Sequence, residues 1–249
     1  VMDNPKFHAR LSPEGVKELC YVLSYIQKFN KQVLLRFEDN CLIIQAADGC
    51  HVAMLNIKFD CNFFDSLIAS GSIGINVEVL NKILSFIEED CFFEYNQNAK
   101  LKVSDHNSEF YMACFDLDAE QYEFPEQQIR EMEQIELFGN NLNMAGLVDI
   151  LKQWASKFNM DKVRFELQED RLKVSGETMA TTAERVLLTV GSTIEEWKAQ
   201  INMRYITQLP KTDHLTIHWK NDFPMMIQEH RSKILLQTFI APMMPDTYE

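Results

Sequence analysis

The sequence repeats one pattern of strands, turns and helix starts after about 130 residues. Residues 33–45, VLLRFEDNCLIIQ, align with residues 163–175, VRFELQEDRLKVS, and their apolar and turn positions coincide. The helix start at residues 75–77, INV, recurs at residues 201–203 as INM. A repeat in which hairpin and helices keep the same order indicates two similar domains. The chain of 249 residues is long enough for two domains of about 125 residues each.

Each copy is predicted to contain a strand, a helix, several strands, a second helix and further strands. Helices are expected at 12–30, 77–88 and 144–158, and a short one opens at Asn202 and ends before Pro210. Their cap residues are Ser12, Asn76 and Asn143. Strands are expected at 7–11, 33–45 with a turn at Asp39-Asn40, 52–59, 91–95, 101–103, 109–115, 135–138, 163–167, 172–174, 215–219, 225–229 and 234–240.

Three of these helices carry an apolar stripe that would pack on a sheet. The stripe residues are Val16, Leu19, Leu23 and Ile26; Leu80, Ile83, Leu84 and Ile87; and Leu147, Ile150, Leu151 and Trp154. Helices on one face of antiparallel sheets define an α+β fold with two tandem domains.

An acidic stretch without helical or strand periodicity lies at the middle of the chain. Residues 115–128, FDLDAEQYEFPEQQ, carry five acidic side chains among apolar ones. Pro125 removes a backbone donor and favours an extended conformation at Phe124. Fully extended, such a segment spans about 45 Å, which is more than a hairpin loop requires. It is therefore predicted to cross a surface, join the two halves and form the wall of a groove.

The charge balance bears on nucleic-acid binding. The formal net charge is −13, from 24 basic and 37 acidic residues, which by itself argues against a polyanionic partner. Six basic residues nevertheless lie on the helix faces turned away from the sheets: Lys17, Lys28, Lys82, Lys152, Arg204 and Lys211. They form either a solvated face or a lining that binds a phosphate backbone without base contacts. Glu18, Glu78, Glu89 and Asp149 lie on or near the same faces, so binding to DNA should be weak and salt-sensitive.

Sequence motifs for catalysis or metal binding are missing. The chain has no Gly-rich phosphate loop, no nucleophile elbow and no His-x-x-x-His or Cys-x-x-Cys spacing on a helix. His214 and His218 are four residues apart, but residues 215–219 are a predicted strand, so the two lack helical ligand geometry. We therefore expect no enzyme, no metal and no cofactor.

The cysteines are predicted to be reduced thiols in the core of an intracellular protein. All six lie far apart in the sequence, mostly among apolar residues: Cys20, Cys41, Cys50, Cys61, Cys91 and Cys114. No apolar run approaches the ~18 residues that a membrane-spanning helix needs.

Several short motifs, spread over nearly the whole chain, resemble those of one family. They are FHARL at 7–11, DGCHV at 48–52, IN at 75–76 with KIL at 82–84, DLDAEQ at 116–121, FPEQ at 124–127, SGE at 175–177, RYI at 204–206, DFP at 222–224 and IAP at 240–242. Together they resemble a DNA sliding clamp of the proliferating cell nuclear antigen (PCNA) family. The acidic linker and the terminal Ala-Pro are the specific motifs.

The resemblance implies a pseudo-sixfold ring of three subunits, each with two tandem domains of the DNA-clamp fold. The domains would be residues 1–117 and 134–249, joined by an interdomain connecting loop at 118–133. The ring would encircle double-stranded DNA independently of sequence, with the helices lining its channel. It would act as a processivity factor and docking platform for DNA polymerase, clamp loader and repair factors, in the nucleus or a viral replication compartment.

The resemblance also implies two protein-binding surfaces. Short partner peptides would bind a groove formed by His51, Met54, Tyr122, Phe124, Pro125, Phe223, Pro224, Phe239, Ile240, Ala241, Pro242 and Met243. Subunits would join through Glu109, Tyr111 and Cys114 on one edge strand and Arg185 and Leu187 on another. The Met and aromatic residues near the C-terminus suit an adaptable binding surface; the alternative is that they form core.

Two other functions stay open at this point. The chain could be one subunit of a heterotrimeric checkpoint-type clamp, similar to the 9-1-1 ring. It could also be a clamp-fold scaffold that binds only proteins. Salt-dependent retention on circular but not linear duplex would separate a clamp from such a scaffold.

Overall fold

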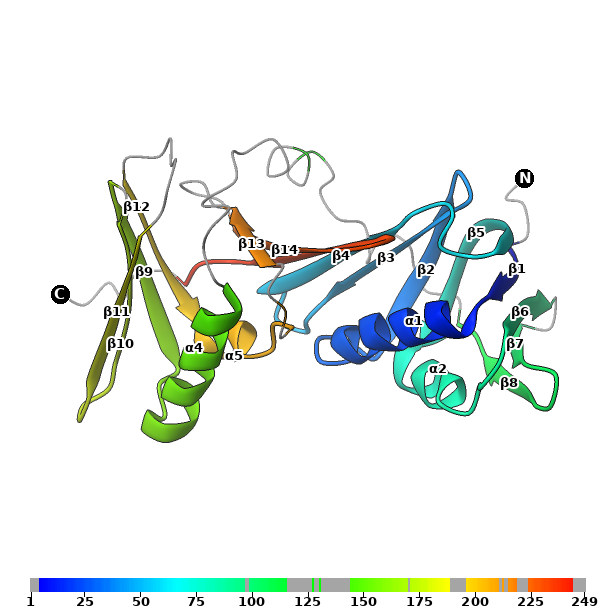
Figure 1. Cartoon of the computed structure of the whole chain (residues 1–249), viewed down its shortest axis with the longest axis horizontal. Helices are drawn as coiled ribbons and strands as arrows, with labels where there is room; N and C mark the ends of the chain where they lie inside the picture. Colours follow the sequence, from blue (N-terminus) through cyan, green and yellow to red (C-terminus); the bar gives the residue numbers. More distant parts are fainter. Residues whose placement is uncertain are drawn as a thin grey trace. The chain divides into compact units, whose positions relative to one another are not determined.

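The computed structural model describes residues 5–96, 99–115, 127, 130, 144–169, 171–188, 196–210, 212, 215–218 and 224–243. The chain forms two compact units (Figure 1). The first contains residues 1–124 with 231–236, and the second contains residues 125–230 with 237–249. No helix in the described residues combines the length and the hydropathy needed to cross a bilayer.

The first unit is built on an antiparallel sheet. Its strands are β1 (Lys6–Leu11), β2 (Gln32–Glu38), β3 (Cys41–Ala47), β4 (Ala53–Phe59), β5 (Ser66–Asn76), β6 (Cys91–Asn96), β7 (Lys100–Ser104) and β8 (Glu109–Ala113). They are ordered β4-β3-β2-β5-β1-β6-β7-β8, which leaves β8 at one end. The long strand β5 pairs with β1 through its first half and with β2 through its second. The strands predicted for this half are confirmed.

Two helices pack on one face of this sheet, α1 (Pro13–Ile26) and α2 (Val77–Leu84) (Figure 1). Their predicted caps are present: Ser12 Oγ accepts from Gly15 N–H at 3.2 Å and Asn76 Oδ1 from Val79 N–H at 3.1 Å. All four stripe residues of α1 are buried. Both helices end four residues earlier than predicted. After Ile26 and Leu84 the backbone tightens into three-residue turns, although the apolar pattern continues.

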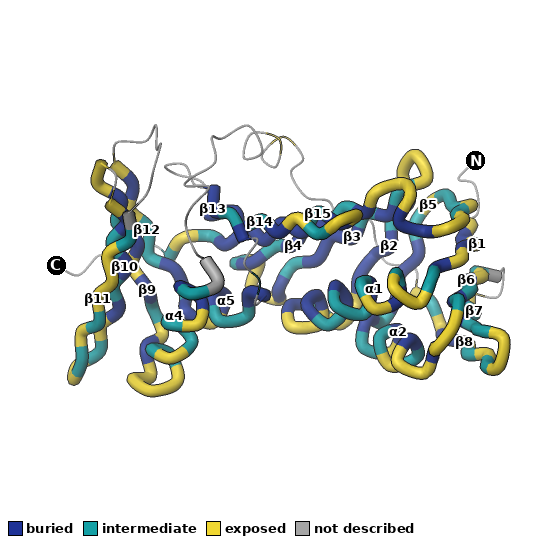
Figure 2. The backbone as a smooth tube through the Cα atoms, in the orientation of Figure 1, coloured by how far each residue is buried: buried dark blue, intermediate teal, exposed yellow. Residues whose placement is uncertain are grey.

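Aromatic rings fill the core of the first unit. Phe7 on β1 lies 4.7 Å from Phe37 on β2, 5.3 Å from Phe93 on β6 and 6.0 Å from Phe64, measured between ring centroids. Phe7 is 2% exposed, and the buried positions of its strand alternate as expected for a sheet with one covered face (Figure 2). This cluster ties four separate segments of the chain together.

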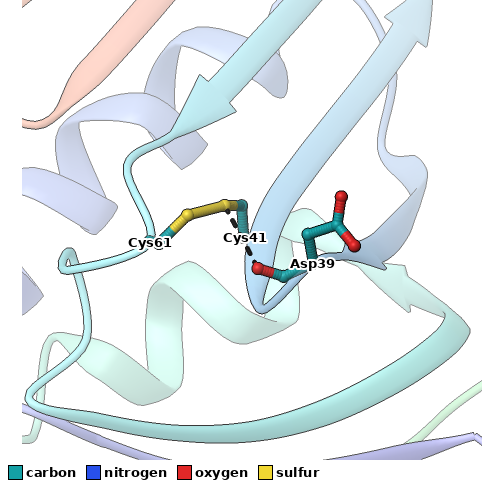
Figure 3. Close-up of a disulfide and its surroundings, with 3 residues drawn as sticks. All are labelled: Asp39, Cys41 and Cys61. Atoms are coloured by element: carbon teal, nitrogen blue, oxygen red, sulfur yellow. Dashed lines mark hydrogen bonds between the residues drawn. A yellow bond between two sulfur atoms is a disulfide. The ribbon is translucent and has the colours of Figure 1, made fainter.

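The prediction that all cysteines are reduced core thiols is wrong for three of them. Cys41 and Cys61 form a disulfide (Figure 3), and Cys50 is exposed. The antiparallel register of β3 and β4, in which Ile43 opposes Lys58, brings Cys41 to a Cα–Cα distance of 4.4 Å from Cys61. Cys61 lies two residues after the end of β4, and sequence spacing alone does not reveal that it would meet Cys41. Cys91 is a buried thiol, and desolvation raises its pKa to about 12.

The second unit repeats the arrangement of sheet and helices. Its elements are α4 (Met144–Phe158), β9 (Lys162–Gln168), β10 (Arg171–Glu177), β11 (Thr182–Leu188), β12 (Glu196–Asn202), α5 (Met203–Ile206), β13 (Leu215–His218), β14 (Met225–Arg231) and β15 (Ile234–Ile240). One antiparallel sheet has the order β11-β10-β9-β12, with α4 and α5 on one side (Figure 1). The predicted bounds of α4 are confirmed, whereas α5 ends well before Pro210. The predicted strand at 135–138 and the cap Asn143 lie outside the described residues.

The internal repeat extends to individual hydrogen bonds. Asn76 and Asn202 both have extended backbone and cap the helix that follows. The first helical residue donates its backbone N–H to the residue just before the preceding hairpin in both copies: Val77 to Lys31 O and Met203 to Asp161 O, each at 2.8 Å. Matching contacts at matching positions confirm the repeat that the sequence predicts.

The tip of the β14–β15 hairpin, residues 231–236, is part of the first unit. The Asp60 N–H donates to Lys233 O at 2.9 Å, and Lys233 Nζ donates to Asn62 O at 2.9 Å. Sequence order did not predict that residues this late in the chain would complete the first unit.

Candidate nucleic-acid interface and protein-binding surfaces

The helix faces carry exposed cations in both units. Lys17 on α1, Lys28 just after α1, Lys82 on α2 and Arg204 on α5 are all exposed. Lys28 Nζ lies 5.6 Å from the centre of the Tyr25 ring, and the Arg204 guanidinium lies 5.9 Å from that of Tyr205. These four predicted residues are therefore accessible to a ligand. Lys28 and Arg204 also make cation–π contacts with neighbouring tyrosine rings.

Two other predicted phosphate-binding residues differ from these four. Lys152 on α4 is only half-exposed, and its Nζ donates to Leu209 O at 3.4 Å. That contact links α4 to the turn after α5, so this ammonium has a structural partner. Lys211 lies outside the described residues.

Carboxylates on the same faces hold several cations. Glu78 on α2 pairs with Lys82 at 2.8 Å and with Lys31 at 3.0 Å. Hydrogen bonds from Lys82 and Lys31 lower the pKa of Glu78 to about 2. The spacing of Glu78 and Lys82 predicts an i,i+4 pair. Lys31 is distant from Glu78 in the sequence and is brought to the start of α2 by the strand β2 that follows it.

Arg231 at the hairpin tip binds the outward side of α1. Its Nε donates to Glu18 Oε2 at 2.6 Å and its NH2 to Glu18 Oε1 at 3.0 Å. The guanidinium lies 3.8 Å from the centre of the Tyr21 ring. This bidentate, stacked arrangement is the strong form of an arginine–carboxylate contact. Within the described residues Glu18 therefore pairs with Arg231 and not with Lys17, the lysine of α1.

Replacing Glu18 with Gln is expected to lower the free energy of unfolding by about 1–2 kcal/mol at neutral pH. The hydrogen bond from Arg231 lowers the pKa of Glu18 below its usual 4.5. A depressed folded-state pKa gives stability that is present above the unfolded pKa and lost as pH falls through the folded one. The difference between wild type and E18Q in urea unfolding should therefore shrink below about pH 4.5. An E18Q penalty that stays constant down to pH 3 would contradict this.

The residues predicted for the peptide groove differ in exposure. His51 is exposed in the loop before β4, with φ 55°, and Met54 on β4 is half-exposed. In the second unit Pro242 is exposed, Pro224, Ala241 and Met243 are half-exposed, and Phe239 and Ile240 are buried. Tyr122, Phe124, Pro125 and Phe223 lie outside the described residues.

The apolar cluster near the C-terminus divides into core and surface. Met225, Met226 and Phe239 are buried, as the core alternative predicts. The segment that follows β15 is fixed by the Met243 N–H, which donates to Gln200 O on β12 at 2.7 Å. Among the residues described in this region, 241–243 are exposed or half-exposed and so are open to a ligand.

The predicted subunit-interface residues lie on two strands at the ends of their sheets, β8 and β11. On β8, Glu109 and Tyr111 are exposed, and the Tyr111 hydroxyl donates to Glu109 Oε2 at 3.1 Å. On β11, Arg185 is exposed and Leu187 half-exposed; Cys114, just past β8, is half-exposed. Large apolar side chains accompany them: Tyr111 is 55% exposed and Val186 is 53% exposed. Open strands with exposed apolar side chains favour pairing with another chain.

Solved structures of sliding clamps have the same fold. PCNA from Entamoeba histolytica superposes with a TM-score of 0.77 at 16% identity, covering 96% of this chain and 99% of that one. A. fulgidus PCNA bound to the C-terminal region of FEN-1 gives a TM-score of 0.76 at 15% identity, with 96% and 99% covered. The PCNA2–PCNA3 complex from Sulfolobus tokodaii gives 0.73 at 15% identity, with 94% and 98% covered. The chain therefore has the DNA-clamp fold over nearly its whole length.

A sequence relative points to the same class. The chain is 25% identical over 173 residues to the "Probable DNA polymerase sliding clamp 2" of Paramecium bursaria Chlorella virus 1. The match covers 62% of this chain and 65% of the viral protein, which is less than two thirds of either. No family model matches the sequence. The resemblance to sliding clamps of the PCNA type is thus confirmed in fold and supported by a sequence relative.

Proposed function

We propose that this protein is a sliding clamp that encircles duplex DNA and acts as a processivity factor and docking platform. The observation that carries the proposal is the clamp fold over nearly the whole chain together with exposed cations on its helix faces. Lys17, Lys28, Lys82, Arg204 and Lys211 would contact phosphates, with Lys152 in a lesser role. Contacts to phosphates alone bind any sequence, as a sliding protein requires.

The ring would contain three copies, joined where β8 of one copy pairs with β11 of the next. Domains 1–117 and 134–249 and the connecting loop 118–133 would give it pseudo-sixfold symmetry. A head-to-tail contact of this kind must close into a ring or it produces a fibre. The protein would act without cofactor or catalysis where DNA is replicated, in the nucleus or in a viral replication compartment.

Retention on DNA circles tests the proposal. The full chain is incubated with a nicked circular plasmid, and gel filtration separates DNA-bound protein from free protein. The measurement is repeated after the plasmid has been cut once to make it linear. A clamp stays on the circle in low salt and is lost when the circle is opened, because it slides off the ends. Equal retention on both forms would indicate DNA binding without encircling, and no retention on either form would favour a protein-only scaffold.

A mixed ring is the second candidate, and one comparison favours it. The Sulfolobus tokodaii structure is a complex of two distinct clamp chains, PCNA2 and PCNA3. A checkpoint-type heterotrimer would likewise be a ring assembled from different clamp chains. The mass of the purified chain alone decides: a trimer indicates a homotrimer, whereas a monomer or dimer that grows only when a sister chain is added indicates a mixed ring.

We also propose that short peptides of partner proteins bind beside residues 241–243. Polymerase, clamp loader and repair factors would use a Gln-x-x-aliphatic-x-x-aromatic-aromatic peptide. The groove would include His51, Met54, Tyr122, Phe124, Pro125, Phe223 and Pro224 as well. An A. fulgidus PCNA structure contains the C-terminal region of FEN-1, which supports a peptide-binding role for this fold.

Pro242→Ala is expected to weaken binding of such a peptide about tenfold, because Pro242 is exposed and rigid. Phe239 is a poor choice, since it is 3% exposed and its truncation would open a core cavity. Met179→Ala is the control, because this side chain is fully exposed in the β10–β11 loop. Fluorescence anisotropy with a labelled peptide measures both variants. Equal affinity of P242A and M179A would place the peptide elsewhere.

A further inference from the structure

Glu78 holds two cations of the candidate DNA-binding face at once. Its Oε1 lies 2.8 Å from Lys82 Nζ, one turn further along α2, and its Oε2 lies 3.0 Å from Lys31 Nζ. Lys31 is fixed at this position by the backbone, because its carbonyl accepts the Val77 N–H at 2.8 Å. Both oxygens of one carboxylate are therefore used, and each by a different lysine.

We infer that Glu78 sets the affinity of this helix face for duplex DNA by occupying the two lysines that phosphates would otherwise bind. The inference rests on the proposed sliding-clamp function. It adds Lys31 to the residues that contact DNA and makes Glu78 a resident substitute for a phosphate group. A carboxylate and a phosphate offer lysine the same type of charged oxygen acceptor.

The pairs are placed so that they can be exchanged. The side chains of Lys31 and Lys82 are 69% and 71% exposed, and that of Glu78 is 36% exposed. Solvent-exposed ion pairs are weak and screened by salt. A phosphate group of DNA can therefore compete with the Glu78 carboxylate for Lys31 and Lys82. The cluster of three charges carries a net charge of +1 rather than the +2 of its lysines alone. DNA must therefore displace Glu78 or tolerate its repulsion.

A purely structural role for Glu78 predicts something different. An acid in the first turn of a helix interacts with the helix dipole, and a glutamate four residues before a lysine supports the helix. In that case removal of the carboxylate would affect the helix but not the binding of DNA. Glu14 provides a matched comparison, since it is the second residue of α1 as Glu78 is of α2. Glu14 has no ion pair within the described part of the chain.

Binding of a short fluorescent duplex is measured for the full-length wild type, Glu78→Gln and Glu14→Gln across a range of KCl concentrations. Each phosphate neutralised by a lysine contributes about 0.9 to the slope of log affinity against log salt. We expect E78Q to steepen that slope by about 1 to 2 and to bind about 3- to 10-fold more tightly in low salt. E14Q, which removes the same formal charge, should leave the slope unchanged.

A double substitution tests the coupling directly. If Glu78 masks Lys82, then Lys82→Gln costs little affinity in the wild-type background and more in the E78Q background. Far-UV circular dichroism verifies that the helix content is equal in all variants.

The outcomes separate this inference from the proposed function. Suppose that wild type binds DNA measurably and that wild type, E78Q and E14Q have identical slopes of log affinity against log salt. That result would overturn the inference without contradicting the proposed sliding-clamp function. Absence of binding by every variant, even in low salt, would overturn both. If the effects of E78Q and Lys82→Gln on affinity are additive in the double substitution, Glu78 does not mask Lys82.

Discussion

Val186→Glu on β11 is expected to convert a trimer into monomers of 29.1 kDa. Val186 is 53% exposed on a strand at the end of its sheet, where the proposed ring contact would cover it. Within one subunit the new carboxylate would face Lys173, the cross-strand neighbour of residue 186, so the fold should tolerate it. In the ring it would be desolvated at the proposed contact with the next copy. An uncompensated charge at an interface costs about 3 kcal/mol or more, and a ring has three such contacts.

Light scattering at micromolar concentration measures the effect. Wild type should have three times the chain mass, V186E the mass of a single chain, and Val186→Thr, which keeps the branched shape, the wild-type mass. Retention on circular DNA should fall with the loss of the trimer, because a single subunit cannot encircle a duplex. A trimeric V186E would exclude β11 as the ring contact. A monomeric wild type would exclude the homotrimer and direct attention to a mixed ring.

Features of the fold that depend on local chemistry could be predicted from the sequence. Asn76 and Asn202 were expected to start helices and do so, because a short side-chain acceptor satisfies free backbone donors wherever it precedes an apolar repeat. The Asp39-Asn40 turn was expected and has positive φ at both residues, which is typical of a tight hairpin. Helix ends were predicted less well, since the apolar pattern continues through Phe29 and Ile87 after the helical hydrogen bonds stop.

Features that depend on distant segments could not be predicted from spacing. The Cys41–Cys61 disulfide requires the register of two strands. Arg231 reaches Glu18 across 213 positions in the sequence. The same reason limits the candidate site: Glu18 and Glu78 were recognised as acids near the helix faces, but their partners Arg231 and Lys31 were not. Which cations a phosphate can reach is decided by those partners and not by the count of basic residues.

Phe7→Ala is expected to lower the free energy of unfolding of the first unit by about 3–5 kcal/mol. The ring is 2% exposed and contacts aromatic rings from β2, β6 and the segment after β4, so its loss leaves a cavity that no single neighbour can fill. Such a change is a large part of the 5–15 kcal/mol that stabilises a typical domain.

Two probes are needed to place this loss of stability, because tryptophan fluorescence reports on one unit only. All three tryptophans, Trp154, Trp197 and Trp219, fall in the second unit. Urea unfolding of F7A should therefore show a large shift in far-UV circular dichroism and a smaller one in fluorescence. Phe86→Ala is the control: this ring is 66% exposed and its loss should change stability by no more than about 0.5 kcal/mol. If F7A and F86A unfolded at the same urea concentration, the aromatic cluster around Phe7 would not be the core that holds β1, β2 and β6 together.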